Sequence, residues 1–396
     1  MINNIARGLA VALSAASLLA AVPAVASANP GDPTVLSWGA GRTGQLGNGT
    51  MTDSLSPSSV TSLFRGDVDQ ISAGGTSSAD SFALARTDKT VTSWGHNSSG
   101  QLGNGGDTDR TVPTTVPRLT NIKGIAAGGK HGLALDASGQ VYSWGDNAYG
   151  QLGNNRTGDS RTVPDRVLGM PKVKQISAGC DFSLALLENG KVYAWGRGIH
   201  GQLGNGSRAT GSVPRQVTGL ENITQIDAGC HHALALTADS TVKSWGYNLY
   251  GQLGNSSTKS STIPVDVDRL EGVSDIEAGA HHNYVITSDS MVWGWGNNQY
   301  GQLLEADEAF DQNVSRTNRT APVEIPCLEG VQQLAAGARH GAAVTADEVF
   351  TWGHNGEGQL GNGTTTPRYE SVKIVNEGAA VKSVAASLGG NTTYAY

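Results

Sequence analysis

The chain has 396 residues and a formal net charge of −7, from 27 Lys and Arg against 34 Asp and Glu. Nucleic-acid binders usually carry a basic face, so this acidic balance argues against nucleic acid as a partner. Glycine supplies 54 residues and proline only 13, which predicts many tight turns in a folded chain rather than a low-complexity one.

Residues 1–28 have the pattern of a secretory signal peptide. Arg7 precedes an apolar stretch at residues 9–22, and a small-residue cleavage site, Ala-Ser-Ala, ends at Ala28. No later stretch approaches the roughly 20 apolar residues of a membrane span, so we expect no membrane insertion. The pattern therefore predicts cleavage after Ala28 and secretion of residues 29–396 as a single domain.

A Trp-Gly pair recurs seven times, at spacings of 50 to 57 residues. The repeated tryptophans are Trp38, Trp94, Trp144, Trp195, Trp245, Trp295 and Trp352. Each pair is followed within a few residues by Gly-Gln-Leu. A second landmark, Ala-Gly, recurs in six copies, and Ser387 stands in place of its glycine in the last copy. Self-similarity at a fixed period indicates a repeat architecture.

Within each unit the local pattern is that of β-strands. Runs at residues 184–186 and 191–195 are separated by Asn189-Gly190, which is the strongest short-range hairpin signal. Pro-x-x-Val stretches, such as residues 113–116, predict an outer strand because proline is tolerated chiefly at sheet edges. No capped amphipathic helix is visible. The sequence therefore predicts an all-β fold, a seven-bladed β-propeller with four-stranded blades.

The two chain ends fit the same scheme. Residues 35–38 form a lone tryptophan strand, and residues 384–396 form a lone Ala-Gly-type segment, so their pairing is expected to close the ring and remove two sheet edges. Strand alternation places Trp195 and Tyr193 on one face of a blade and Val192 on the other. A small residue precedes each tryptophan, and we expect large residues of one blade to fill the room left by small residues of its neighbour.

The unit Val-x-Ser-Trp-Gly-x-Asn-x-x-Gly-Gln-Leu-Gly, with Ala-Gly-x-x-His-x-Leu-Ala-Leu as at residues 127–135, resembles the regulator of chromosome condensation repeat family over residues 34–396. The resemblance implies a seven-bladed propeller, a fold that hosts many unrelated activities. Its nuclear branch exchanges guanine nucleotides and binds chromatin, which the acidic charge, the export signal and the missing basic tail disfavour here. Its plant photoreceptor branch depends on tryptophans clustered with arginines, whereas only Trp293 lies outside the repeat set.

A third branch, exported bacterial propellers that inhibit β-lactamases, resembles this chain most in layout. It shares export, seven blades and a half-blade at each terminus. That branch implies a binding face formed by two short loops per blade, one after Trp-Gly and one after Ala-Gly. Here the repeats are longer and those loops lack tryptophan, so the resemblance does not carry over a target enzyme.

Four variable residues lie between each Trp-Gly and the following Gly-Gln. Tyr149, His200, Tyr250 and Tyr300 occupy the same position in four consecutive units, which predicts an arc of aromatic rings on one face. Such rings are typical of protein interfaces, and the alternative is that they only cover the rim of the blades. The further candidates for partner binding, from these loops and from those after Ala-Gly, are Asp146, Asp181, His231, Tyr247, His281 and Arg339.

Histidine and cysteine also recur at fixed positions. Four histidines in one strand position favour a repeated hydrogen bond over a metal site, because ligands must converge; they are His131, His232, His282 and His340. Cys180 and Cys230 are equivalent in adjacent units, so a disulfide is one possibility, with Cys327 as the thiol left over. The acidic insert at 305–318 lacks the spacing of a calcium loop, which favours a solvated loop.

No Gly-x-Ser-x-Gly elbow, His-Glu-x-x-His motif or phosphate loop is present, so we expect neither an enzyme nor a cofactor. The leading hypothesis is an exported, monomeric bacterial module that presents variable loops to a protein partner, with inhibition of a secreted or envelope enzyme as one form of that function. The alternative is a lectin-like or hydrolytic propeller.

Overall fold

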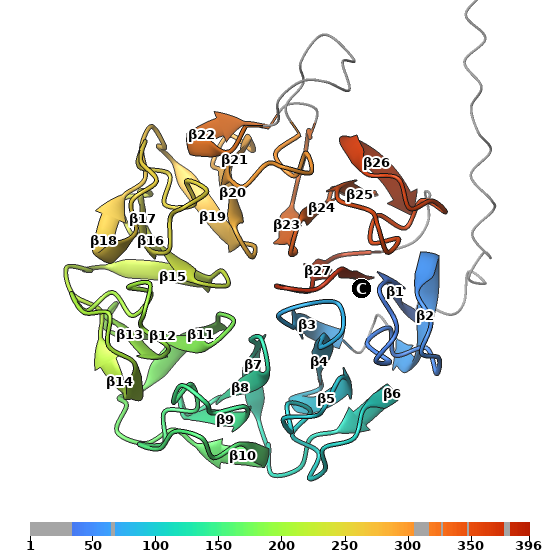
Figure 1. The fold of residues 1–396 in the computed structure, drawn as a ribbon, viewed down its shortest axis with the longest axis horizontal. Coiled ribbons are helices and arrows are strands. Elements are labelled where there is room, and N and C mark those ends of the chain that lie inside the picture. The colour runs from blue at the N-terminus through green and yellow to red at the C-terminus, as the bar shows by residue number, and fades with distance from the viewer. Residues whose placement is uncertain (1–33, 65–67, 305–316, 326–327, 347, 376–380) are drawn as a thin grey trace, which may run out of the picture.

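The computed structural model describes residues 34–64, 68–304, 317–325, 328–346, 348–375 and 381–396. Within these ranges the chain forms 28 β-strands and no helix. The strands make seven four-stranded antiparallel sheets arranged as a ring (Figure 1). This confirms the predicted all-β, seven-bladed propeller. The described residues contain no helix long and apolar enough to cross a membrane.

We number the blades from the one that holds both chain ends. Blade 1 consists of β27 (Val384–Ala386), β28 (Thr392–Ala395), β1 (Thr34–Gly39) and β2 (Ser54–Phe64). Blade 2 consists of β3 (Val68–Gly74), β4 (Phe82–Thr87), β5 (Thr90–Gly95) and β6 (Arg110–Thr115). Blade 3 consists of β7 (Ile122–Ala127), β8 (His131–Asp136), β9 (Val141–Gly145) and β10 (Arg161–Arg166). Blade 4 consists of β11 (Val173–Ala178), β12 (Phe182–Leu187), β13 (Val192–Gly196) and β14 (Gly211–Gln216).

Blade 5 consists of β15 (Ile223–Ala228), β16 (His232–Thr237), β17 (Val242–Gly246) and β18 (Ser261–Asp266). Blade 6 consists of β19 (Val273–Ala278), β20 (His282–Thr287), β21 (Val292–Gly296) and β22 (Arg319–Glu324). Blade 7 consists of β23 (Gln333–Ala336), β24 (His340–Val344), β25 (Val349–Gly353) and β26 (Arg368–Val375). In each blade the first strand of this order lies innermost and the last lies outermost, and the outermost strand contains a proline in every blade except blade 7 (Figure 1).

Local sequence explains both the hairpins and the closure. Asn189 and Gly190 form the turn between β12 and β13, where Gly190 has a φ of 76°, a left-handed conformation that glycine adopts without strain. The ring closes where β1 pairs antiparallel with β28, with Ser37 opposite Tyr394, as the half-blade at each terminus predicts. Seven blades therefore form one continuous ring with the first and last strands in the same sheet.

The repeat tryptophans join each blade to the one before it. All seven are completely buried, and each donates its indole N–H to the main-chain carbonyl of the Gly-Gln-Leu glutamine in the preceding blade, over 2.8–2.9 Å. Glycine makes room for the ring: a Cβ at Gly103, in the preceding blade, would lie 2.7 Å from the indole of Trp144. The small residue before the tryptophan has a further role, since the Ser143 hydroxyl donates to the Leu152 carbonyl within its own blade (2.8 Å).

Three of the four recurrent histidines form hydrogen bonds across these same interfaces. His131 Nε2 donates to Ser183 Oγ (2.9 Å), and His340 Nε2 donates to Thr393 Oγ1 (2.9 Å), in each case across to the next blade. Both hydroxyls in turn donate to the glutamine carbonyl that accepts the indole N–H. Within the described residues, no group of His, Cys, Asp and Glu is arranged to hold a metal ion.

Candidate functional site

The first half of the site is the row of loops that follow Trp-Gly. In blade 5, Asn248 Nδ2 donates to the carbonyls of Ser257 (2.9 Å) and Lys259 (3.1 Å), which folds the loop back on itself. Gln252 Oε1 then accepts the backbone N–H of Tyr250 (2.9 Å). The same glutamine contact holds Tyr149, His200 and Tyr300 in their loops. The buried Gln of each repeat, together with the buried Asn in the repeats that have one, thus fixes the backbone, and the variable residues of the loop project from it.

The second half is the row of loops that follow Ala-Gly, around the mouth of the ring. Cys180 N donates to the Cys230 carbonyl (3.1 Å), Cys230 N to the Ala280 carbonyl (3.3 Å) and Ala280 N to the Gly337 carbonyl (3.2 Å). The structure also joins Cys180 and Cys230 by a disulfide, with their Cα atoms 4.4 Å apart. This belt of backbone contacts sets the spacing of the residues that come directly after it, including Asp181 and His231. Cys327 lies outside the described residues.

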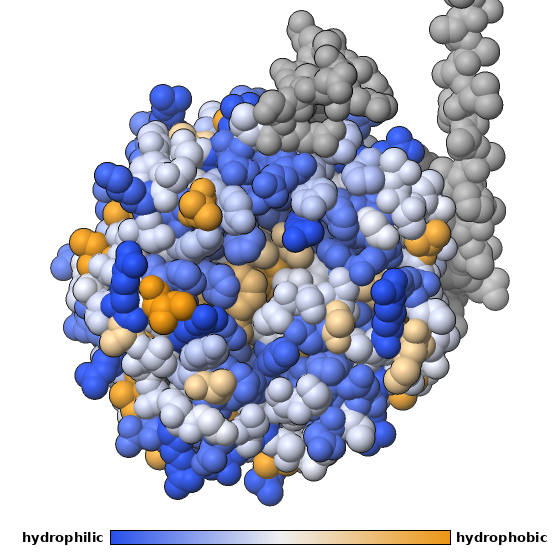
Figure 2. Space-filling view, viewed as in Figure 1, coloured by the Kyte–Doolittle hydropathy of each residue, from blue (hydrophilic) through white to orange (hydrophobic). Residues whose placement is uncertain are grey.

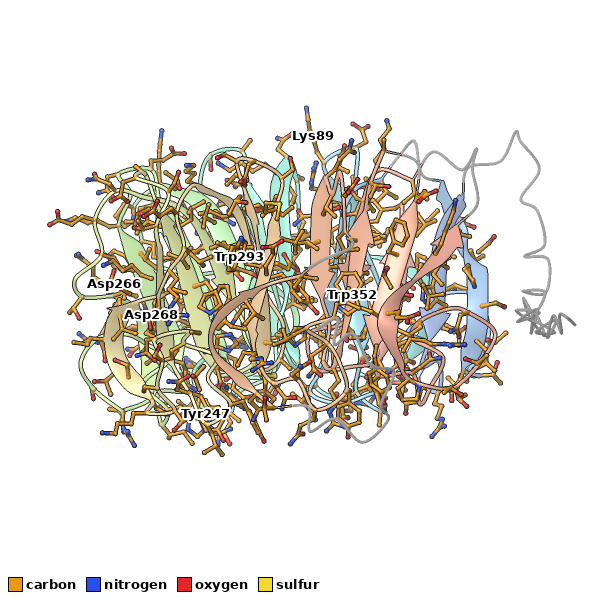
Figure 3. The ribbon with its side chains drawn as sticks, turned by 90° about the horizontal axis from the view of Figure 1, so that it is seen from above. Lys89, Tyr247, Asp266, Asp268, Trp293 and Trp352 are labelled. Carbon is orange, nitrogen blue, oxygen red and sulfur yellow. A yellow bond between two sulfur atoms is a disulfide. The ribbon has the colours of Figure 1, made fainter. Side chains whose placement is uncertain are left out.

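The two rows meet in an aromatic patch that spans blades 4, 5 and 6. We use this name for His200, His231, Tyr247, Tyr250 and His281. The centroid of the His200 ring lies 4.9 Å from that of Tyr247 and 5.3 Å from that of His231. The His281 ring lies 5.2 Å from Tyr250 and 6.1 Å from Tyr247. Figure 3 shows Tyr247 at one face of the disc, and Lys89, in the β4–β5 turn, at the opposite face.

An arginine stacked on a tyrosine flanks the aromatic patch on each side. On the blade 3 side, the Arg197 guanidinium lies 4.6 Å from the centroid of the Tyr149 ring and pairs with Asp181 (2.9 Å). On the blade 7 side, Arg339 lies 5.1 Å from the Tyr300 centroid, and its Nη1 donates to the tyrosine hydroxyl (3.3 Å). A planar guanidinium over an aromatic face is a favourable cation–π arrangement.

Burial keeps the histidines of the aromatic patch neutral at pH 7. Desolvation lowers the pKa of His231 to about 4 and that of His281 to about 3. Burial, followed by the charges of Arg197 and Arg208, lowers the pKa of His200. Desolvation also raises the pKa of Tyr247. The centre of the site is therefore an uncharged surface of half-buried rings.

The structure places nine of the ten residues predicted from sequence within this network of ring and arginine contacts. Asp146 is the tenth, and its carboxylate accepts instead from Gln151 Nε2 (2.8 Å) within its own loop. Sequence reasoning did not single out Arg197 or His354, whose ring lies 4.7 Å from that of Tyr300. Both occupy the loop position of Asp146 and Tyr247, so comparing that column across the units would have found them.

Two aliphatic residues beside the aromatic patch were also not singled out. Ile199 is 42% exposed and Leu249 is 58% exposed, and they occupy the same loop position in blades 4 and 5. The other blades have arginine, serine, alanine, glutamine or glycine at this position. Figure 2 shows isolated hydrophobic residues on a mostly hydrophilic surface, with the largest over the β11–β18 side of the ring. The site thus combines uncharged rings with exposed aliphatic side chains.

Comparison with known proteins agrees with this architecture. The RCC1-like domain family matches residues 34–395. The ultraviolet-B receptor UVR8 of Arabidopsis thaliana is 34% identical over 179 residues, which are 44% of this chain and 40% of the receptor. The human E3 ubiquitin-protein ligase HERC2 is 35% identical over 175 residues, 43% of this chain but only 4% of the ligase. These alignments therefore span less than half of each curated relative.

Solved structures show the same fold. Prp20p of Saccharomyces cerevisiae superposes with a TM-score of 0.79 at 24% identity, over 92% of this chain and 91% of Prp20p. Human WBSCR16 superposes with a TM-score of 0.76, also at 24% identity, over 91% of this chain and 98% of that protein. With the family match over nearly all of the described residues, these likenesses lead to one conclusion: the chain belongs to the RCC1-like domain family.

Proposed function

We propose that this protein is an exported, non-enzymatic, monomeric binding module whose aromatic patch contacts a protein partner. The observation that carries the proposal is the contact between rings of three successive blades, with Ile199 and Leu249 exposed beside them. Tyrosine and other amphipathic rings are enriched in protein interfaces because they bury large areas with little loss of conformational entropy. The loops that carry these rings vary between blades, while the glutamine that holds each loop does not.

Structures with the same fold support this use of a propeller. The crystal structure of Prp20p was reported together with its binding properties to Gsp1p and histones. The yeast protein has also been crystallised in complex with Kap60. A shared fold does not carry a partner with it, so the partner of this chain must be recognised by its own residues. We do not assign guanine-nucleotide exchange to this chain, whose formal net charge is −7.

Export is supported by the signal-peptide pattern of residues 1–28 and by the Cys180–Cys230 disulfide, a bond typical of oxidising compartments. Inhibition of a secreted or envelope enzyme is the form of binding suggested by the resemblance to the bacterial β-lactamase-inhibiting propellers. Protein recovered from the culture medium should begin at Asn29 when its N-terminus is sequenced. Full-length protein retained inside the cells would argue against export.

Partner capture from culture medium tests the binding role. The double variant Leu249→Asp with Tyr250→Ala places a charge on the exposed aliphatic position and removes one ring of the aromatic patch. Leu168→Asp is the matched control, because Leu168 is 71% exposed but follows β10, at the end of the strand away from the Trp-Gly loops. We expect a protein that is retained by the wild type and the control and lost by the double variant. Equal recovery by all three proteins would remove the aromatic patch from the binding site.

A further inference from the structure

The surface around the aromatic patch is rich in hydrogen-bond donors and cations. The Arg339 side chain is exposed and contacts the ring and hydroxyl of Tyr300, and it has no carboxylate partner among the described residues. Arg208 is likewise exposed and has no ion pair in the part of the chain that the structure describes. Of these three arginines, only Arg197 forms an ion pair among the described residues, with Asp181. These cations gather on one face of a chain with a net charge of −7.

Acceptors are correspondingly scarce beneath the same loops. In blades 3, 6 and 7, the side-chain amide of the Gly-Gln-Leu glutamine donates to the first residue of its loop, which is Asp146, Asn297 or His354. In blades 4 and 5 that residue is Arg197 or Tyr247, neither of which accepts from the amide. The Nε2 groups of Gln202 and Gln252 are buried without an acceptor among the described residues. Among the described residues, the loops of blades 4 and 5 are therefore short of accepting groups.

The exposed aliphatic positions indicate what else the partner must supply. Ile199 and Leu249 stand beside rings that are uncharged at pH 7, and this apolar surface has no covering in the described structure. A phosphate backbone offers nothing that packs against such side chains, whereas a protein segment with aliphatic or aromatic residues does. The apolar centre and the cationic edge of this surface together therefore favour a protein segment over a nucleic acid as the partner.

We infer that the segment bound at the aromatic patch is an acidic, apolar stretch of polypeptide. An aliphatic or aromatic side chain of this segment packs beside Leu249 and Tyr250, and a neighbouring carboxylate pairs with Arg339. Electrostatic complementarity of this kind steers association and sets the register of the bound segment. This inference rests on the proposed function and specifies the chemistry of the partner.

Selection from a displayed library of short random peptides on the immobilised protein tests this inference, with counter-selection on the Leu249→Asp variant. We expect the selected peptides to carry Asp or Glu next to a large apolar residue. Arg339→Gln should weaken them about 3- to 10-fold, the range expected for one rim charge. Arg269→Gln is the control, since Arg269 is exposed and follows β18 at the opposite face, and it should leave affinity unchanged.

The remaining outcomes distinguish a failure of this inference from a failure of the proposed function. The selected peptides could instead be basic or uncharged, with an affinity that depends on Leu249 but is unchanged by Arg339→Gln. This result would overturn the inference while leaving the proposed function standing. If counter-selection on Leu249→Asp removes every peptide that the wild type retains, both the inference and the proposed function would be overturned. A single-stranded oligonucleotide that displaces the peptides and loses affinity in both variants would assign the face to nucleic acid and overturn the inference.

Discussion

The Nε2 atom of His232 in blade 5 lies 2.6 Å from the Oδ1 atom of Asn283 in blade 6, and this buried contact joins the two blades. At the next interface the equivalent residues are His282 and Gly341, and both ring nitrogens of His282 are buried without a partner among the described residues. Where this position holds phenylalanine, as at Phe182, the residue opposite is equally small and apolar, Ala233. His282 is thus the one histidine of the series whose hydrogen bond is missing.

Replacing these two histidines by phenylalanine should have opposite effects on stability. His282→Phe removes a buried ring with unsatisfied nitrogens, and we expect it to raise the free energy of unfolding by about 1 kcal/mol. His232→Phe leaves the Oδ1 atom of Asn283 without its donor and should lower that free energy by about 1–3 kcal/mol. Chemical denaturation of the purified variants measures both. Destabilisation of equal size in the two would show that the hydrogen bond does not distinguish these interfaces.

Acid should destabilise the propeller through its buried histidines. Desolvation lowers the pKa to about 4 or about 3 at His131, His232, His282 and His340. The folded state then binds fewer protons than the unfolded state, so the contribution to stability is complete above the unfolded value of 6.5 and is lost as the pH falls towards 4.

Two carboxyls of the inner strands act in the opposite direction. Burial raises the pKa of Asp227 to about 6 and that of Glu277 well above its usual range, so these groups favour folding more as the pH falls. Burial raises the pKa of Asp275 as well, but these three carboxyls are outnumbered by the buried imidazoles, which also include His231 and His281, and we expect the midpoint of thermal unfolding to fall between pH 7 and about pH 5. A midpoint that stays level or rises over this range would contradict the assignment, and His282→Phe should make the fall shallower.

Reduction of the disulfide should lower stability without opening the ring. Cys180 and Cys230 are 50 residues apart in sequence, and a cross-link over such a loop contributes about 2–4 kcal/mol, chiefly by restricting the unfolded chain. Unfolding with and without a dithiol reductant measures the difference. The variant Cys180→Ser with Cys230→Ser should unfold at the midpoint of the reduced wild type and respond no further to reductant. If the reductant lowers the unfolding midpoint of that variant by as much as it lowers the midpoint of the wild type, the effect does not come from the Cys180–Cys230 disulfide.

The repeat tryptophans should matter far more than the additional one. Trp195 is completely buried, and its indole N–H donates to the Gln151 carbonyl over 2.8 Å, so Trp195→Ala should cost about 3–5 kcal/mol of unfolding free energy. Trp293, on β21, is only partly buried and serves as the control, with a smaller loss expected (Figure 3). Losses of similar size for the two substitutions would mean that the contact between blades is not the main source of stability.

The ring was predictable from sequence because each unit repeats its own landmarks. Trp-Gly, Gly-Gln-Leu and Ala-Gly set the number of blades, and the half units at the two termini indicated how the ring closes. The partners of individual side chains were not predictable in the same way. Ser183 and Asn283 accept from histidines that lie 52 and 51 residues earlier, and nothing in the local pattern marks such pairs.

The sequence predicted only part of the candidate site, because contacts between residues of different blades are not visible in the local pattern. Tyr149, His200, Tyr250 and Tyr300 share one loop position, and that column is visible as an aromatic series. Arg197 occupies the variable loop position of Asp146 and Tyr247, so its column could have marked it as a candidate, but its contact with the Tyr149 ring required the structure. The aromatic patch depends on which blades are neighbours in space, so its extent over blades 4 to 6 required the structure.

Hydrogen exchange of the backbone amides, compared between the free protein and its complex with the captured partner, tests most directly which surface binds. The account predicts slower exchange in the complex for residues 197–200, 231, 247–250 and 281, with no change around Lys89 and Leu168 on the other side of the disc. Protection confined to the Lys89 and Leu168 side, with the aromatic patch unchanged, would contradict it.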